Sequence, residues 1–102
     1  MKITVLVAIL LGAGVAARAD EFTGYLADAK CAAAGKAGSA GHAECSKKCV
    51  AAGEKIVLVG EDGKILQIKN QDKVQPHVGH KVTLQATREG DILDVQGGKH
   101  LD

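Results

Sequence analysis

The apolar segment at the start of the chain decides how much sequence remains to form a folded domain. One positive charge at Lys2 precedes a run over 3–11 that is apolar except for Thr4, and a small-x-small triplet ends at Ala19. A charged start, a short apolar region and such a triplet are typical of a cleavable secretion signal. The sequence therefore predicts a signal peptide over 1–19 and a mature chain over 20–102 that is periplasmic or secreted.

A membrane anchor is the alternative interpretation of this segment. The uncharged stretch from Ile3 to Ala17 is only fifteen residues long, whereas about 20 are needed to cross a bilayer. A lipid anchor would need a cysteine directly after the apolar run, and the first cysteine is Cys31. We therefore expect a soluble product with no stable membrane span after cleavage.

The mature chain is short and nearly neutral. Removing 19 of the 102 residues leaves 83, which is enough for one small domain and too few for two. Lys2 and Arg18 leave with the signal, so 11 basic side chains remain beside 12 acidic ones, and Phe22 and Tyr25 are the only aromatic residues besides histidine. A nucleic-acid surface needs a basic stripe or stacking rings, so we expect no nucleic-acid partner.

Runs of β-branched and alternating apolar residues predict five strands. The clearest pair flanks Asp62-Gly63, a dipeptide that favours a tight hairpin turn. A second hairpin is expected around the turn at Glu89, Gly90 and Asp91. The expected strands cover 21–27, 55–60, 64–69, 80–88 and 92–96, and the tail from Gly97 is expected to fray.

The segment between the first two strands is expected to be a loop followed by one helix. Residues 32–41 place glycines among other small residues, which makes regular structure costly. Residues 42–52 lack proline and glycine, and Gly53 follows where a glycine commonly ends a helix. We expect a cysteine-containing loop-helix insertion over 28–53 and a connector with one helical turn over 70–79.

Five strands with one short helix inserted after the first predict a mainly β fold, a small five-stranded Greek-key barrel of the oligonucleotide/oligosaccharide-binding (OB) type. Gly24 to Cys31, Cys45 to Cys49 and Val78 to Leu84 resemble segments of a group of small secreted bacterial proteins of unknown function with an OB-like barrel. The resemblance spans nearly the whole mature chain and implies an extracytoplasmic location but no activity. It also implies that the cysteine insertion lies beside the Glu89 turn, on the rim where such barrels bind ligands.

The three cysteines leave one thiol unpaired if a single disulfide forms in an oxidising compartment. Cys45 and Cys49 lie four residues apart on the expected helix, where Cβ atoms are about 6 Å apart instead of the ~3.8 Å that a disulfide requires. Cys31 would then pair with Cys49 or with Cys45, and this closure would stabilise the domain by about 3 kcal/mol. The unpaired thiol would also allow a disulfide-linked dimer.

The same cysteines, if reduced, form a candidate metal site together with His42. Cys31, His42, Cys45 and Cys49 offer three thiolates and one imidazole, the ligand set of a closed tetrahedral zinc site, and soft sulfur would also accept copper(I). His42 precedes Cys45 by about one turn, so we expect both on the same helix face as Cys49. Because no Cys-x-x-Cys motif is present, a protein without cofactor is the first expectation, with zinc or copper as the alternative.

Three further residues are secondary candidates. His77 and His80 form a His-x-x-His pair that could hold a metal or be solvated. Asp28 precedes the first cysteine by three residues and could bond to the loop or end the strand. A thiol-redox role for an unpaired cysteine, activated by Lys47 or Lys48, lacks the usual Cys-x-x-Cys spacing.

These features predict a non-catalytic module of the cell envelope, stabilised by a disulfide at Cys31, that contacts a small ligand or another envelope protein. The alternative is a periplasmic protein that binds zinc or copper through the cysteines and His42. No pair of acid and base side chains has a spacing that indicates an enzyme. Oxidised cysteines favour the first function, and reduced cysteines with a metal-dependent fold favour the second.

Overall fold

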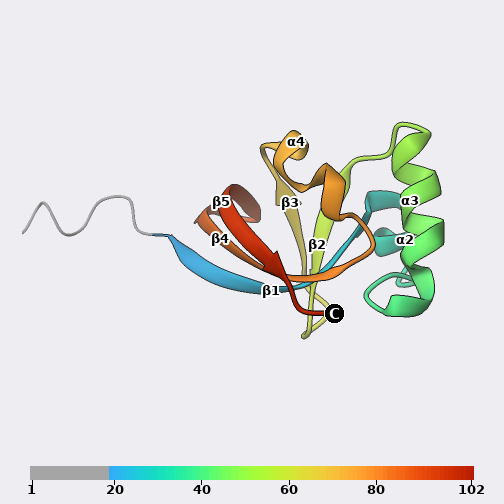
Figure 1. Ribbon diagram of the computed structural model, residues 1–102, viewed down its shortest axis with the longest axis horizontal. Helices are drawn as coiled ribbons and strands as arrows, with labels where there is room; N and C mark the ends of the chain where they lie inside the picture. The colour runs from blue at the N-terminus through green and yellow to red at the C-terminus, as the bar shows by residue number, and fades with distance from the viewer. Residues whose placement is uncertain (1–18) are drawn as a thin grey trace, which may run out of the picture.

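The computed structural model describes residues 19–102 (Figure 1). The predicted signal peptide therefore lies, apart from its last residue, outside the described residues, and its cleavage stays a prediction. Within residues 19–102, no helix is long and apolar enough to cross a membrane.

Five strands form one sheet, which confirms the prediction of a mainly β fold with five strands. They are β1 (Asp20–Asp28), β2 (Ile56–Gly60), β3 (Ile65–Ile68), β4 (Lys81–Glu89) and β5 (Ile92–His100). β1 pairs with both β2 and β4, so the order β1-β2-β3-β5-β4 closes on itself. The pairing of β3 with β5 is parallel and the other pairings are antiparallel.

Short helices fill two of the connections between strands. Between β1 and β2 lie α2 (Ala29–Ala33), η1 (Ala40–His42) and α3 (Ala43–Ala51), and between β3 and β4 lie α4 (Gln71–Val74) and η2 (Gln75–His77). α3 is the helix expected in the insertion, and α4 supplies the expected helical turn of the connector. The expectation of one short helix was incomplete, because α2 forms at the start of the segment that the sequence predicts as a loop. The reason is a helix cap at Asp28, described below.

The end of α3 confirms the role expected for its glycine. Gly53 has a φ of 111°, a conformation in which a side chain would be strained. The N–H of Gly53 donates to the carbonyl of Val50, and the N–H of Glu54 donates to the carbonyl of Cys49, each at 3.0 Å. This pair of bonds is the Schellman motif, and it fixes the last turn of α3, which carries Cys49.

The insertion covers the outer face of β1 and β2, so that both faces of these strands are buried. The inner core includes Leu26 and Leu58 together with apolar side chains of the other strands. A second, outer cluster consists of Ala27, Ala32, Val57 and Val59. Ala32 belongs to α2, which lies against β1 and β2 (Figure 1). Double-sided burial explains why β2 is a continuous apolar run rather than an alternating one.

The end of the chain differs from the expectation of a frayed tail after Gly97. β5 continues to His100, which pairs with Val82 of β4. Gly98 allows this pairing, because a Cβ atom there would lie 2.8 Å from the carbonyl oxygen of Thr83. Gly97 and Gly98, which predict a loop in the sequence, therefore lie within β5 and allow its close contact with β4.

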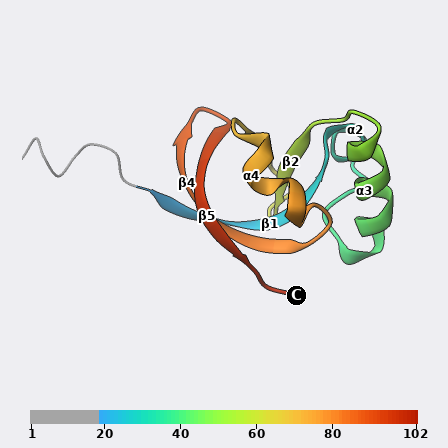
Figure 2. The same ribbon diagram turned by 45° about the horizontal axis from the view of Figure 1, so that its top comes forward.

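The Glu89 turn does not neighbour the cysteine insertion. β1 and β4 are antiparallel, with Asp20 opposite Ala86, so the end of β4 at Glu89 lies beside the start of β1. The insertion instead follows the other end of β1, at Asp28. Figure 2 shows the β4–β5 turn on the opposite side of the sheet from α3. The expectation of a shared rim was wrong for this geometric reason.

Replacing Gly24 tests the close packing of β1 between its two partners. Gly24 lies opposite Gly60 of β2 and Val82 of β4, and a Cβ atom on it would overlap the carbonyl oxygen of Val59. We expect Gly24→Ala to lower the free energy of unfolding by about 1–3 kcal/mol, measured by urea denaturation. Gly41→Ala is the control, because its Cβ would lie 3.8 Å from the nearest atom, Oγ of Ser39. Equal stability of the two variants would contradict this packing.

Candidate functional site

Asp28 ends β1 and begins α2. It lies opposite Ile56 in the sheet, and its Oδ2 atom accepts a hydrogen bond of 2.8 Å from the backbone N–H of Cys31. A carboxylate in this position satisfies one of the N–H groups that the first turn of a helix leaves without a partner. The cap therefore orders α2 and fixes the position of Cys31 directly after the strand.

The other two cysteines lie on α3. Cys45 and Cys49 are four residues apart and share one face of the helix. α3 packs against β1, Ser46 is buried with 2% of its surface exposed, and Val50 packs against the inner core. These contacts hold the cysteine face of α3 next to the start of α2.

The three thiols form one cluster. The Sγ atoms of Cys31, Cys45 and Cys49 all lie within 4.8 Å of one another. The Sγ atoms of Cys31 and Cys45 are 3.9 Å apart, whereas a disulfide bond is about 2.05 Å long. All three cysteines are free thiols in the structure, and the disulfide between Cys31 and Cys49 or Cys45 stays a prediction.

A buried carboxylate lies beside the thiols. Asp28 has 0% of its surface exposed, and its Oδ1 atom has no hydrogen-bond partner in the described part of the chain. Burial by itself raises the pKa of this carboxyl, but the N–H and thiol of Cys31 and the nearby hydroxyl of Ser46 outweigh it and lower the pKa below its usual value. The site therefore holds a fixed negative charge.

This charge and the limited solvent access keep two of the thiols protonated. Desolvation, the contact with Cys45 and the Asp28 carboxylate raise the pKa of the Cys31 thiol to about 12. Desolvation and the Asp28 charge also raise the pKa of Cys49. Cys45 is the exposed member of the cluster. The arrangement opposes thiolate formation unless a positive charge enters the cluster.

Two residues expected at this site do not contribute to it. His42 lies in η1, before α3 begins, and belongs to neither group of ligand atoms that converge in residues 19–102. Lys47 forms an ion pair of 3.6 Å with Glu44, so its ammonium group has a partner other than a thiol. The structure thus supplies three of the four expected metal ligands, without the imidazole.

His77 and His80 both lie against His100, and Asp102 lies beside His80. The sequence does not indicate His100 or Asp102 as members of this group. The Nδ1 atom of His77 lies 2.6 Å from Nε2 of His100, and Nδ1 of His80 lies 3.2 Å from Oδ1 of Asp102. The hydrogen bond from the N–H of Lys81 holds the pKa of the Asp102 carboxyl below its usual value. The sequence predicts a frayed tail from Gly97, so it gives no indication that His100 and Asp102 belong to a cluster.

One signal in the sequence could have identified the role of Asp28. Aspartate is a preferred N-cap residue, and its side chain bonds the N–H two or three positions later, which is where Cys31 follows. The apolar run Ile56–Val59 of the neighbouring strand indicates that its outer face needs a cover, and α2 supplies it. Burial of Ser46 had no comparable signal, because it depends on how α3 packs.

Comparison of the chain with protein-family models, with curated proteins and with solved structures gave no significant match.

Removing the charge of Asp28 should make the thiols more reactive. Asp28→Asn keeps an oxygen that can cap α2 but removes the negative charge, so the pKa of Cys31 should fall and its alkylation by iodoacetamide should accelerate. The thiolate fraction rises about tenfold for each unit by which the pKa falls, and the rate about threefold because a less basic thiolate is a weaker nucleophile, measured by peptide mass spectrometry of the reduced protein. Asp62→Asn, on the exposed turn between β2 and β3, is the control. If both variants react like the unchanged protein, the charge of Asp28 does not act on the thiols.

Proposed function

We propose that this protein is an exported, non-catalytic metal-binding module of the cell envelope, which binds one thiophilic cation through Cys31, Cys45 and Cys49. The candidate cations are zinc and copper(I), because thiolates select for both. The observation that carries the proposal is the convergence of three Sγ atoms within 4.8 Å, from two different helices.

The orphan oxygen of Asp28 supports a cation in this cluster. Burying a charged group is costly unless it is paired or bonded, and Oδ1 of Asp28 is buried without a partner in the described residues. A cation among the thiols would compensate this charge and would favour the thiolates that the empty site disfavours. For zinc, which takes four ligands in structural sites, we expect a water molecule as the fourth ligand, because neither His42 nor Asp28 belongs to the group of converging ligand atoms.

The architecture proposed for the module is an OB-like Greek-key barrel. Its support is the closed strand order β1-β2-β3-β5-β4 and a helical segment between β3 and β4, both compatible with that fold. The location in the periplasm or outside the cell rests on the apolar segment at the start of the sequence.

A disulfide-stabilised binding module is the second candidate. The 3.9 Å between Cys31 and Cys45 favours this pair over Cys31 and Cys49, because a small side-chain movement would bring the two sulfur atoms into bonding range. Oxidation would pin α2 to α3 and remove two metal ligands. In that case the module would bind an envelope protein or a small ligand through another surface.

Cobalt(II) titration of the reduced mature protein tests the metal-binding proposal. Cobalt replaces zinc in thiolate sites and gives a thiolate-to-metal absorption band, which other ligands do not produce. We expect one equivalent to produce this band, and zinc or copper(I) to abolish it by displacement. Each of Cys31→Ser, Cys45→Ser and Cys49→Ser should weaken binding by on the order of 100-fold or more, since even indirect partners of a metal contribute 10- to 100-fold.

His42→Ala is the matched control, because it removes an expected ligand that lies outside the cluster. It should leave the band and the affinity unchanged. Absence of the band in the unchanged protein, or its persistence in the three serine variants, would refute the thiol site. Detection of one disulfide by mass spectrometry in the protein purified from the exporting cell would favour the second candidate.

A further inference from the structure

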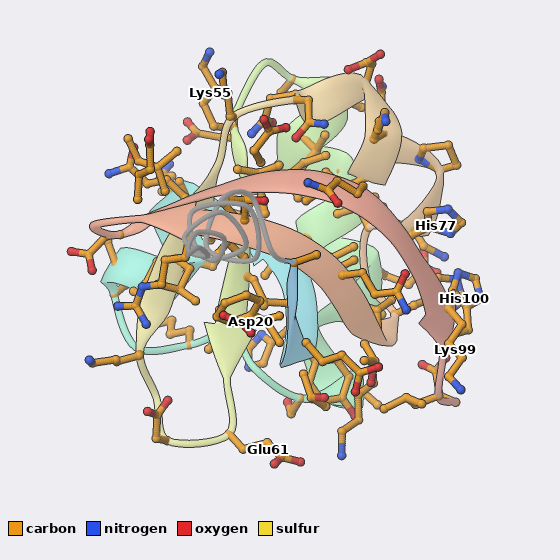
Figure 3. All side chains as sticks on the ribbon, turned by 90° about the vertical axis from the view of Figure 1, so that its left-hand side faces the viewer. Asp20, Lys55, Glu61, His77, Lys99 and His100 are labelled. Atoms are coloured by element: carbon orange, nitrogen blue, oxygen red, sulfur yellow. The ribbon has the colours of Figure 1, made fainter. Side chains whose placement is uncertain are left out.

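Three of the four histidines of the chain lie together at one edge of the sheet. His77 ends η2, His80 precedes β4, and His100 ends β5. The ring of His80 stacks on that of His100, with centroids 4.2 Å apart and 12° between the planes, and the ring of His77 meets His100 edge-on at 4.7 Å. Figure 3 shows His77 and His100 close together on the outside of the sheet.

A carboxylate completes this group. Oδ1 of Asp102 lies 3.2 Å from Nδ1 of His80, and Oδ2 accepts a hydrogen bond of 3.1 Å from the backbone N–H of Lys81. One ligand atom from each of His80, His100 and Asp102 lies within 4.8 Å of the other two. Two imidazoles and one carboxylate therefore converge from two separate segments of the chain, with His77 against His100.

Backbone hydrogen bonds hold these residues in place. The N–H of His80 donates to the carbonyl of His77 at 3.1 Å, and the carbonyl of His80 accepts from the N–H of Leu26 of β1 at 3.1 Å. On the other side, the N–H of Leu101 donates to the carbonyl of Lys81 at 2.8 Å, directly after His100. These backbone bonds thus fix the positions from which the side chains of the cluster extend.

We propose that His80, His100 and Asp102 form a second metal site for a borderline divalent cation such as zinc or copper(II), with His77, which contacts His100, as an additional ligand. Imidazole is a preferred ligand of both ions, whereas soft thiolates favour copper(I) and zinc. The nitrogen ligands of one tetrahedral zinc ion lie about 3.3 Å apart, given zinc–nitrogen bonds of about 2.05 Å. The ligand atoms of His80, His100 and Asp102 lie within 4.8 Å of one another. Binding of one ion requires one of the two stacked rings to rotate, because the ion must lie in the plane of each imidazole. The proposal is independent of the thiol cluster.

The surroundings leave the site accessible. His77 and His100 line a hollow of about 280 Å³, whose apolar side chains include Val82 and Val95. Lys81 does not occupy the cluster, because its Nζ atom pairs with Glu61 at 3.3 Å. Side-chain exposures of 36% for His80 and 39% for Asp102 give an ion a path from solvent.

Zinc titration of the untagged mature protein tests this second site. The protein carries Cys31→Ser, Cys45→Ser and Cys49→Ser, so that sulfur does not compete, and isothermal titration calorimetry measures the affinity. We expect one zinc equivalent, with binding weakened at least tenfold by His80→Ala or by His100→Ala. His42→Ala is the matched control, because it removes the one histidine that lies outside the group. It should leave the affinity unchanged.

A second measurement uses the unmodified cysteines and does not depend on the folding of the serine variant. In the reduced protein, zinc added up to two equivalents should shift the imidazole ring signals of His77, His80 and His100 in proton NMR spectra and leave those of His42 in place. No binding in the titration, equal weakening by His42→Ala, or ring shifts at His42 alone would overturn the proposal.

Discussion

The buried carboxylate of Asp28 is the interaction on which the candidate site depends. Asp28 is the last residue of β1 and the N-cap of α2, so its side chain starts the helix that carries Cys31 directly after the strand. The same carboxylate, inaccessible to solvent and with one oxygen unpartnered, charges the space beside the thiols. The Asp28 carboxylate thus both caps α2 and supplies the negative charge of the site. This fixed negative charge beside three sulfur atoms is the physical reason to expect a cation there.

The fold makes this placement possible by using both faces of two strands. β1 and β2 contribute to the inner core on one side and to the cover under α2 on the other. Because the insertion packs on the sheet, α2 and α3 are held at a fixed distance from each other. The cysteines are 14 and four residues apart in the sequence, and only this packing brings all three sulfur atoms together.

The sequence predicts the local features well and the long-range ones poorly. The strands and the end of α3 follow from β-branched runs, the Asp62-Gly63 turn and Gly53, which act through neighbouring residues. α2 was missed because its stability comes from a cap and from burial of Ala32 against another strand. His100 was placed in a frayed tail because Gly97 and Gly98 disfavour a strand on their own, whereas pairing with β4 extends it. Helical spacing predicts His42 among the ligands, but α3 begins at Ala43 and His42 lies outside the group of converging ligand atoms.

X-ray absorption at the zinc edge of the reduced, zinc-loaded protein with His77→Ala, His80→Ala and His100→Ala identifies the atoms that bind zinc at the thiol cluster. With the imidazole cluster removed, bound zinc reports on the thiol cluster alone. The account predicts three sulfur neighbours at about 2.3 Å and one oxygen neighbour at about 2.0–2.2 Å. A shell of oxygen and nitrogen atoms with fewer than three sulfur atoms would contradict it.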